Sequence, residues 1–180
     1  MHSPLALIHA VTVLSDITDI QTSFCKIIIA IAKTDEVARE NFIRFQVQQP
    51  LVRLIMKQHA ELSKIACMTI TELCVKDHDI RWLCENNHSL IDSIVALLDA
   101  MPHEFRIQME GLRVLVTIDN KVPDIMITIK KLSFFQILKR TKKYLNSCIK
   151  LNQIPSDYDV KDVEDLLESV LWTKEKCIIS

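Results

Sequence analysis

The chain has 180 residues, of which 49% are hydrophobic and 25% are charged, and its formal net charge is -1. This length suits one ordinary domain or one short stack of helices, and this composition excludes a disordered or fibrous protein. The single glycine, Gly111, excludes strand-rich folds and glycine-rich phosphate loops, because hairpin turns, bulges and such loops need several glycines.

Helix-start signals follow one another along the whole chain. In order, they are Ser3 with Pro4, Pro50 before the segment LVRLI, Ser89 with Asp92, Pro123, Ser133 with Gln136, and Ser156 with Asp159. Apolar residues then recur at spacings of three and four, which predicts amphipathic helices of about 8 to 16 residues. Helices of this length are not stable alone, so we expect them to stack.

Three stretches of the chain line up with one another: residues 23–55, 65–98 and 105–138. Their offset of roughly 42 to 45 residues lies in the range that is typical of helical solenoids. In each stretch a long apolar helix is expected to lead, through a polar corner, into a short helix and then a second apolar helix. The chain is therefore predicted to be all-α and built from repeated units.

This pattern resembles the armadillo-repeat family over about residues 20–138, and HEAT repeats are a similar alternative. The resemblance implies a right-handed α-solenoid of about three armadillo-like units over residues 1–155. A C-terminal amphipathic acidic helix over 156–173 would cap the last unit, and 174–180 would form a tail. Armadillo proteins that read extended peptides carry an asparagine on the third helix. Here Ala30, Glu72 and Thr117 occupy that position, so importin-like peptide reading is not expected.

The resemblance also implies a concave face made by the long helices of successive units. The polar positions expected on this face are Lys26, Lys33, Thr69, Glu72, Glu110, Arg113 and Thr117. Extended surfaces of this kind suit protein ligands better than small substrates. We therefore predict a non-enzymatic adaptor or scaffold that binds another protein and takes no small-molecule substrate and no cofactor. His9, His59 and His103 have no serine, cysteine or carboxylate at a recognisable spacing.

Cys74, His78, Cys84 and His88 form the pattern C-x3-H-x5-C-x3-H, which raises the question of a zinc site. C2H2 fingers use a hairpin and a longer separation between the two ligand pairs. In the repeat alignment the cysteines fall on inner helix faces and the histidines at corners, so we predict core and corner residues and no metal. Trp82 and Trp172 are expected to be core anchors. Six irregularly spaced cysteines indicate a reducing compartment, the cytoplasm or the nucleus.

Basic residues without any acidic residue occupy 125–155, and acidic residues dominate 157–168. The basic ridge consists of Lys130, Lys131, Lys139, Arg140, Lys142, Lys143 and Lys150. One interpretation is two solvated helix faces that attract each other. The alternative is a ridge that binds an acidic partner, an anionic membrane surface or nucleic acid, with KRTKK as a nuclear-import signal. Poor aromatic interleaving disfavours specific nucleic-acid reading.

The final four residues, Cys177 to Ser180, fit the C-a-a-X pattern for prenylation, with serine favouring a farnesyl group. Farnesylation at Cys177 would hold the protein reversibly at a membrane, and the basic ridge would supply the second signal that stable anchoring needs. The other interpretation is an unmodified tail. No apolar run in the sequence is long enough to span a bilayer, so a soluble protein is expected.

Overall fold

The computed structural model describes residues 4–13, 17–85, 89–125 and 132–176, and every regular element within these ranges is an α-helix. The predicted all-α class is confirmed. The helices are α1 (Pro4–Val13), α2 (Thr18–Thr34), α3 (Glu36–Arg44), α4 (Gln48–Met56), α5 (Ala60–Leu73), α6 (Asp77–Glu85), α7 (Ser89–Ala100), α8 (Phe105–Lys121), α10 (Leu132–Lys150) and α11 (Val160–Lys176). None of these helices is both long and apolar enough to cross a membrane.

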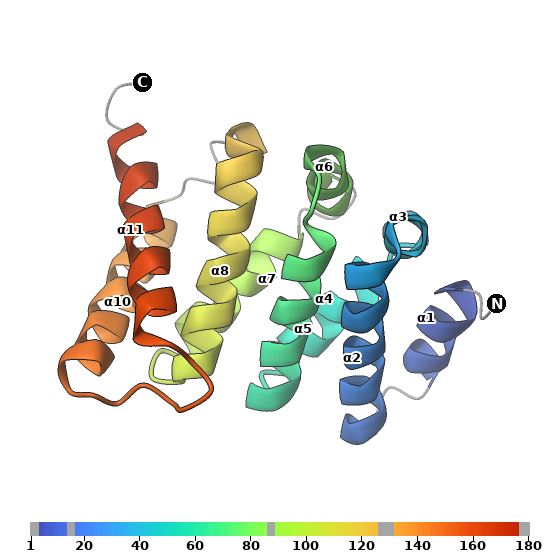
Figure 1. The fold of residues 1–180 in the computed structure, drawn as a ribbon, viewed down its shortest axis with the longest axis horizontal. Coiled ribbons are helices and arrows are strands. Elements are labelled where there is room, and N and C mark those ends of the chain that lie inside the picture. Colours follow the sequence, from blue (N-terminus) through green and yellow to red (C-terminus); the bar gives the residue numbers. More distant parts are fainter. Residues whose placement is uncertain (1–3, 14–16, 86–88, 126–131, 177–180) are drawn as a thin grey trace.

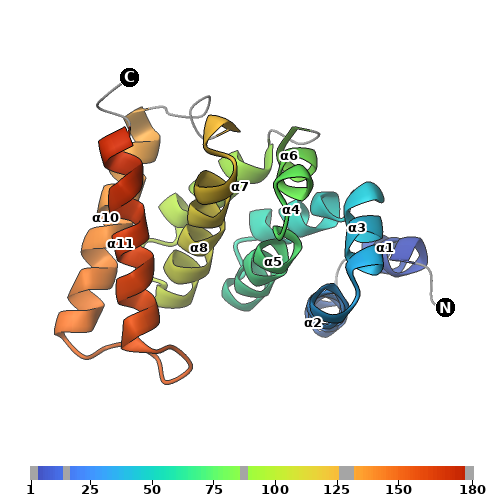
Figure 2. The ribbon, with the colours of Figure 1, turned by 45° about the horizontal axis from the view of Figure 1, so that its top comes forward.

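The helices form two rows (Figures 1 and 2). The first row contains α2, α5, α8 and α11, each in contact with the next. The second row contains α4, α7 and α10, which pack against the first row and against one another. The short helices α3 and α6 lie together along one edge, and α1 packs on α2, α3 and α4. Helices α1 and α11 lie at opposite ends of the long axis (Figure 1).

The centre of the core is α5, which packs against α2, α4 and α8. Ala66, Cys67 and Ile70 are fully buried. Apolar side chains therefore occupy more than one face of this helix. The small side chains of Ala66 and Cys67 let the neighbouring helices approach closely. A helix that is apolar on several sides must be surrounded, so α5 requires neighbours in both rows.

Polar groups at the helix ends set where the helices start and stop. The Asp35 carboxylate accepts the N–H of Ala38 at the start of α3, and His59 accepts the N–H of Leu62 at the start of α5. The ammonium group of Lys121, on α8, donates to the carbonyls of Cys74 and Val75 at the end of α5. This contact satisfies carbonyls that the helix leaves unpaired, and it joins α5 to α8.

Three corners use left-handed backbone conformations without any glycine. Gln46, Gln58 and Asn152 have φ values of 59°, 52° and 52°. Each connects one helix to the next, in positions where glycine carries no steric cost. The single glycine of the chain does not lie at any of these corners. Gly111 lies in the middle of α8, where α7 crosses it closely.

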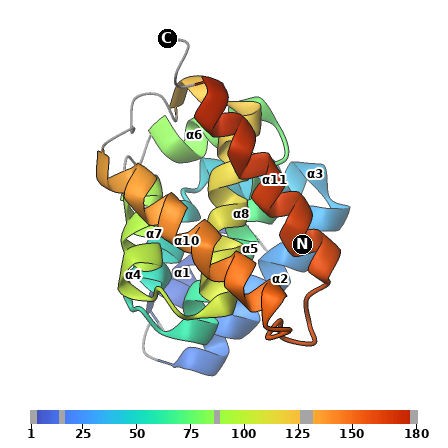
Figure 3. The ribbon, with the colours of Figure 1, turned by 90° about the vertical axis from the view of Figure 1, so that its left-hand side faces the viewer.

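The C-terminal helix α11 begins later than the sequence predicted. The helix-start signal at Ser156 falls in a turn, and α11 starts at Val160, which is exposed. Residues Val163, Leu166 and Leu167 are buried in a second apolar cluster, together with Phe105, Met109, Leu112 and Val116 of α8 and with Leu145 and Cys148 of α10. The acidic helix is thus docked on α8 and α10, and these last two helices cover the end of the molecule (Figure 3).

We expect Gly111→Val to lower the free energy of unfolding by about 2 kcal/mol, because overpacking a close helix crossing forces the neighbours apart. A β-carbon at position 111 would lie 2.8 Å from Cδ2 and 3.2 Å from Cγ of Leu98. Urea denaturation followed by circular dichroism measures the change. Asn120→Val, at an exposed position of the same helix, is the control, and equal losses for the two variants would contradict the role assigned to the crossing.

Candidate interaction surfaces

Five of the seven residues predicted for the concave face lie on three neighbouring helices of the first row with some exposure. Lys26 and Lys33 are exposed on α2, and Glu72 on α5 and Arg113 and Thr117 on α8 are partly exposed. We call these five residues the front strip. The ammonium nitrogen of Lys33 lies 3.2 Å from Oε1 of Glu72, which joins α2 to α5. The front strip therefore crosses helix boundaries.

The other two predicted residues are buried, which corrects their assignment to a binding surface. Thr69 is 0% exposed, and its hydroxyl donates to the carbonyl of Ile65 at 2.7 Å. Glu110 is 2% exposed; it accepts a hydrogen bond of 3.0 Å from the hydroxyl of Tyr158 and pairs with Arg113 at 3.0 Å. Helical spacing alone did not show that neighbouring elements cover these two positions.

Glu110 is part of a clamp that holds the segment before α11 against α8. Burial raises the pKa of the Glu110 carboxyl, while Arg113, Tyr158 and Lys64 act in the opposite direction. Burial and the adjacent Glu110 raise the pKa of Tyr158. The guanidinium of Arg106 donates two hydrogen bonds, of 3.0 and 2.9 Å, to the carboxylate of Asp157. The clamp fixes where α11 docks.

Five residues of the basic ridge lie on α10, while Lys130 and Lys131 fall outside the described residues. Lys139, Lys143 and Lys150 are exposed, and Lys142 is half-buried. Arg140 donates to the Asp99 carboxylate at 2.9 Å and to the Leu98 carbonyl at 3.0 Å, which ties α10 to α7. Arg140 thus pairs with α7, and Asp157 pairs with α8. One interpretation of the sequence had instead been that the basic and acidic helix faces attract each other.

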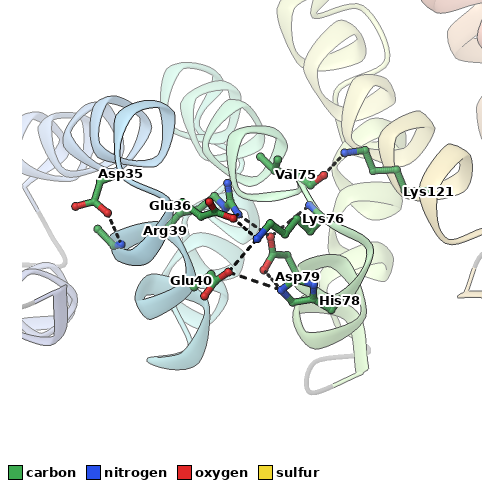
Figure 4. Close-up of polar contacts among 10 residues, drawn as sticks. Asp35, Glu36, Arg39, Glu40, Val75, Lys76, His78, Asp79 and Lys121 are labelled. Atoms are coloured by element: carbon green, nitrogen blue, oxygen red, sulfur yellow. Dashed lines mark hydrogen bonds and ion pairs between the residues drawn. The ribbon is translucent and has the colours of Figure 1, made fainter.

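A cluster of charged residues between α3 and α6 was not predicted from the sequence (Figure 4). We call it the corner cluster, and its members are Glu36, Arg39, Glu40, Lys76, His78 and Asp79. At its centre Arg39 is 5% exposed and Asp79 is 2% exposed, and Nη2 of Arg39 lies 3.3 Å from Oδ2 of Asp79. Asp79 also accepts the backbone N–H of Lys76 at 3.3 Å. The two short helices are therefore joined by a buried ion pair.

The outer members of the corner cluster surround this pair. The ammonium group of Lys76 contacts Glu36 and lies 3.2 Å from Oε1 of Glu40. Lys76 lowers the pKa of Glu36 through a hydrogen bond and through its charge. The imidazole Nε2 of His78 lies 3.3 Å from Oδ1 of Asp79 and 3.9 Å from Oε1 of Glu40. His78 thus covers the two carboxylates from the solvent side.

A depression of about 440 Å³ opens beside the corner cluster, and its lining residues are Glu40, Ile43, Arg44, His78, Asp79 and Trp82. Trp82 is 46% exposed, so the prediction that it is a core anchor was wrong. The side chain of Trp172 lies outside the described residues. On α6 the residues Ile80, Leu83 and Cys84 are buried, whereas Trp82 is exposed, and the apolar residue type alone did not reveal its outward position.

The cysteines of the C-x3-H-x5-C-x3-H pattern belong to the core, as the sequence analysis predicted. Cys74 and Cys84 are buried, and burial raises the pKa of the Cys74 thiol. His78 is at the corner, whereas His88 lies outside the described residues. Among the residues with described side chains, no group of three histidine, cysteine or acidic residues could hold a metal ion. Cys177, the candidate for farnesylation, also lies outside the described part of the chain.

Comparison with known proteins gives a similar fold without a family. No protein-family model and no curated protein matches the chain. The crystal structure of an engineered protein is similar, with a TM-score of 0.66 and 16% sequence identity, over 95% of this chain and 63% of that one. The chain thus spans less than two thirds of the engineered protein, and at this identity the likeness concerns the fold alone.

We expect Asp79→Ala to lower the free energy of unfolding by about 3 kcal/mol, because it removes the buried carboxylate that pairs with Arg39 and leaves this guanidinium only the more distant Glu36, at 3.8 Å. Chemical denaturation in urea measures this. Asp77→Ala is the matched control, because Asp77 is an exposed acidic residue in the same first turn of α6. A surface change of this kind stays within about 0.5 kcal/mol of the parent. Similar losses for both variants would show that the buried pair is not what joins α3 to α6.

The raised pKa of Glu110 predicts a pH-dependent stability. Because the carboxyl binds a proton more tightly in the folded state, its ionised form disfavours folding at neutral pH. This disadvantage fades as the pH falls through the raised pKa towards the ordinary value of 4.5. We expect Glu110→Gln, which can still accept the Tyr158 hydroxyl, to melt at a higher temperature than the parent at neutral pH. The advantage should shrink as the pH is lowered.

Thermal unfolding between neutral pH and pH 4.5 tests this expectation, with Glu72→Gln on the surface as the control. An advantage for Glu110→Gln that stays constant with pH, or that grows as the pH falls, would contradict the assignment.

Proposed function

We propose that this chain is a stack of armadillo-like helical units and acts as a non-enzymatic scaffold that binds another protein along its first row. The observation that carries the proposal is the front strip, in which polar side chains of α2, α5 and α8 lie exposed or partly exposed on three adjacent long helices. An extended protein segment can contact such a strip at several points, whereas a small substrate needs an enclosed site.

The order of the helices supports the repeat part of the proposal. Two shorter helices and a longer one follow one another as α3, α4 and α5, with 9, 9 and 14 residues, and again as α6, α7 and α8, with 9, 12 and 17 residues. Polar links join equivalent elements of successive units: Lys33 to Glu72 between long helices, and Arg39 to Asp79 between short ones. Arg81 on α6 and Asp124, 43 residues further on, continue this series. Contacts that reach only the next unit are typical of helical repeat proteins.

The position of α11 changes how the last unit is assigned. It lies beside α8 in the row of long helices, and α10 lies beside α7 in the second row (Figure 1). On this proposal α10 and α11 are the second and third helices of the last unit, at the positions that α7 and α8 take in the unit before. From the sequence, α11 was instead predicted to be an added capping helix. The strip available to a partner would then extend from α2 to the exposed acidic side of α11.

The chemistry of the buried residues favours binding over catalysis. Burial raises the pKa of Cys25 to about 11 and also raises the pKa values of Cys67 and Cys74, so these thiols are protonated and unreactive at neutral pH. Binding through the front strip would rely on charges and hydroxyls, since Ala30, Glu72 and Thr117 replace the asparagines that read a peptide backbone in the armadillo family.

Charge reversal on the front strip tests the proposal. We expect the double variant Lys26→Glu/Thr117→Glu to recover at least about tenfold less of a bound protein than the parent does. Each substitution adds a negative charge, and this charge disrupts the electrostatic complementarity between the front strip and its partner. The measurement is affinity purification from cells after cross-linking, with quantitative mass spectrometry. The two positions are partly or fully exposed and lie outside the ion pairs between helices, so folding is expected to be retained.

Arg53→Glu is the control, because Arg53 is exposed on α4 in the other row. Recovery that is specific to the parent and to this control supports binding along the first row. The same proteins in equal amounts from the double variant, or no specific protein from the parent, would refute it.

A further inference from the structure

Helix α10, the last helix of the second row, carries three lysines whose charges are not paired within the described part of the chain (Figure 3). Lys139, Lys143 and Lys150 are exposed, and none of their ammonium groups forms an ion pair there. The neighbouring Arg140, by contrast, pairs with Asp99 at 2.9 Å. Helix α10 itself contains no acidic residue. We call Lys139, Lys143 and Lys150 the lysine stripe.

The lysine stripe lies on the side of α10 that faces away from α8. Thr141 is buried, and its hydroxyl donates to the side-chain oxygen of Gln108 on α8. Lys139 and Lys143 each lie two residues from Thr141, which is a rotation of about 200° around the helix. Lys150 lies nine residues from Thr141, which is about two and a half turns. All three lysines therefore point outwards and form a straight ridge about 16 Å long.

The acidic helix α11 docks on a different side of α10. Leu145 and Cys148 of α10 are buried in the apolar cluster that also contains Val163 and Leu167 of α11. Cys148 lies two residues before Lys150, which is again a rotation of about 200°. The body of α10 therefore separates the lysine stripe from the side on which α11 packs.

An exposed leucine continues the lysine stripe at the end of α10. Leu151 is 64% exposed and directly follows Lys150. The backbone fixes this helix end, because the N–H of Gln153 donates to the carbonyl of Cys148 at 2.9 Å and Asn152 takes a left-handed conformation. Leu151 is thus an apolar side chain that a closed turn holds beside a positive charge.

The charge and shape of this ridge suit an anionic membrane better than a nucleic acid or a protein. Single strands are held by aromatic rings as well as by charge, but Tyr144 is turned to the carbonyl of His103 and Phe134 is buried. A nucleic acid would also leave Leu151 in water. Protein partners bind mainly through anchors in fitted pockets, and a ridge offers none. At a membrane each lysine contributes about a fivefold factor in affinity, and a leucine can enter the interface.

We propose that the outer side of α10 binds the surface of an anionic membrane. Lys139, Lys143 and Lys150 contact the negative lipid headgroups, and Leu151 enters the interface between them. The binding is reversible, because three lysines and one leucine form a weak anchor. The lysines point away from the first row, so a membrane on this side leaves the front strip open to a protein. The two surfaces belong to different rows, and each can fail without the other.

Sedimentation of the purified full chain with vesicles tests the proposal. The vesicles consist of phosphatidylcholine alone or with about one third phosphatidylserine. Lys139→Gln/Lys143→Gln removes two charges from the lysine stripe. Lys26→Gln/Arg53→Gln is the matched control, because it removes two charges from exposed positions on α2 and α4. Glutamine is a good helix former, so both variants are expected to fold, and circular dichroism checks this.

The parent is expected to bind the vesicles that contain phosphatidylserine and not the neutral ones. This binding should fall steeply as the salt concentration rises from about 0.05 to 0.3 M, because salt screens exposed charges. Lys139→Gln/Lys143→Gln should bind at least about tenfold more weakly than the parent, and the control should change by less than about twofold. Leu151→Gln should weaken binding by about fivefold, since it removes the apolar side chain from the interface.

Three results would overturn the proposal: no binding of the parent at millimolar anionic lipid, equal binding to neutral vesicles, or equal losses for the stripe variant and its control. An oligonucleotide and an acidic peptide are titrated in parallel. Binding of either one without binding to the anionic vesicles would assign the lysine stripe to that ligand and would also overturn the proposal. Recovery of a protein through the front strip plays no part in this measurement, so the two proposals are tested separately.

Discussion

The arrangement of this protein depends on the burial of α5. This helix has 14 residues, too few for a stable isolated helix in water, and it is apolar on the sides that meet α2, α4 and α8. Each fully buried large aliphatic side chain, such as Leu73 or Ile70, contributes about 1.5 to 3 kcal/mol relative to exposure. Removing any one neighbour would return part of this surface to water. The two rows therefore form together, and the front strip is the side of the first row that this packing leaves free.

The short helices α3 and α6 follow an electrostatic constraint instead. Arg39 and Asp79 are buried together, and a buried charge is tolerated only when it is paired, so the register of one short helix on the other is specified. The same register brings Trp82 beside Glu40 and opens the depression at this edge.

Much of the helical structure could be predicted from the sequence, while the surfaces could not. The start signals at Pro4 and Ser89 mark the starts of α1 and α7, because capping and proline geometry act within one turn. The signal at Ser156 failed, since the clamp of Asp157 and Tyr158 on α8 holds that segment in a turn. Thr69, Glu110 and Trp82 were assigned to the wrong environment. Their exposure depends on which neighbouring helix covers them, and helical spacing does not contain that information.

The sequence by itself determined that the chain is all-α, that its helices are amphipathic, and that Cys74 and Cys84 are core residues, whereas α2, α8, α10 and α11, with 17 to 19 residues, are longer than the predicted 8 to 16. These properties depend on local propensities and on the period of apolar residues, which are local in the chain. Only the tertiary structure decided that α11 lies beside α8, that Arg39 pairs with Asp79, and that Trp82 faces solvent beside a depression. Each of these depends on the positions of residues far apart in the chain, and their relative placement is set when the two rows pack around α5.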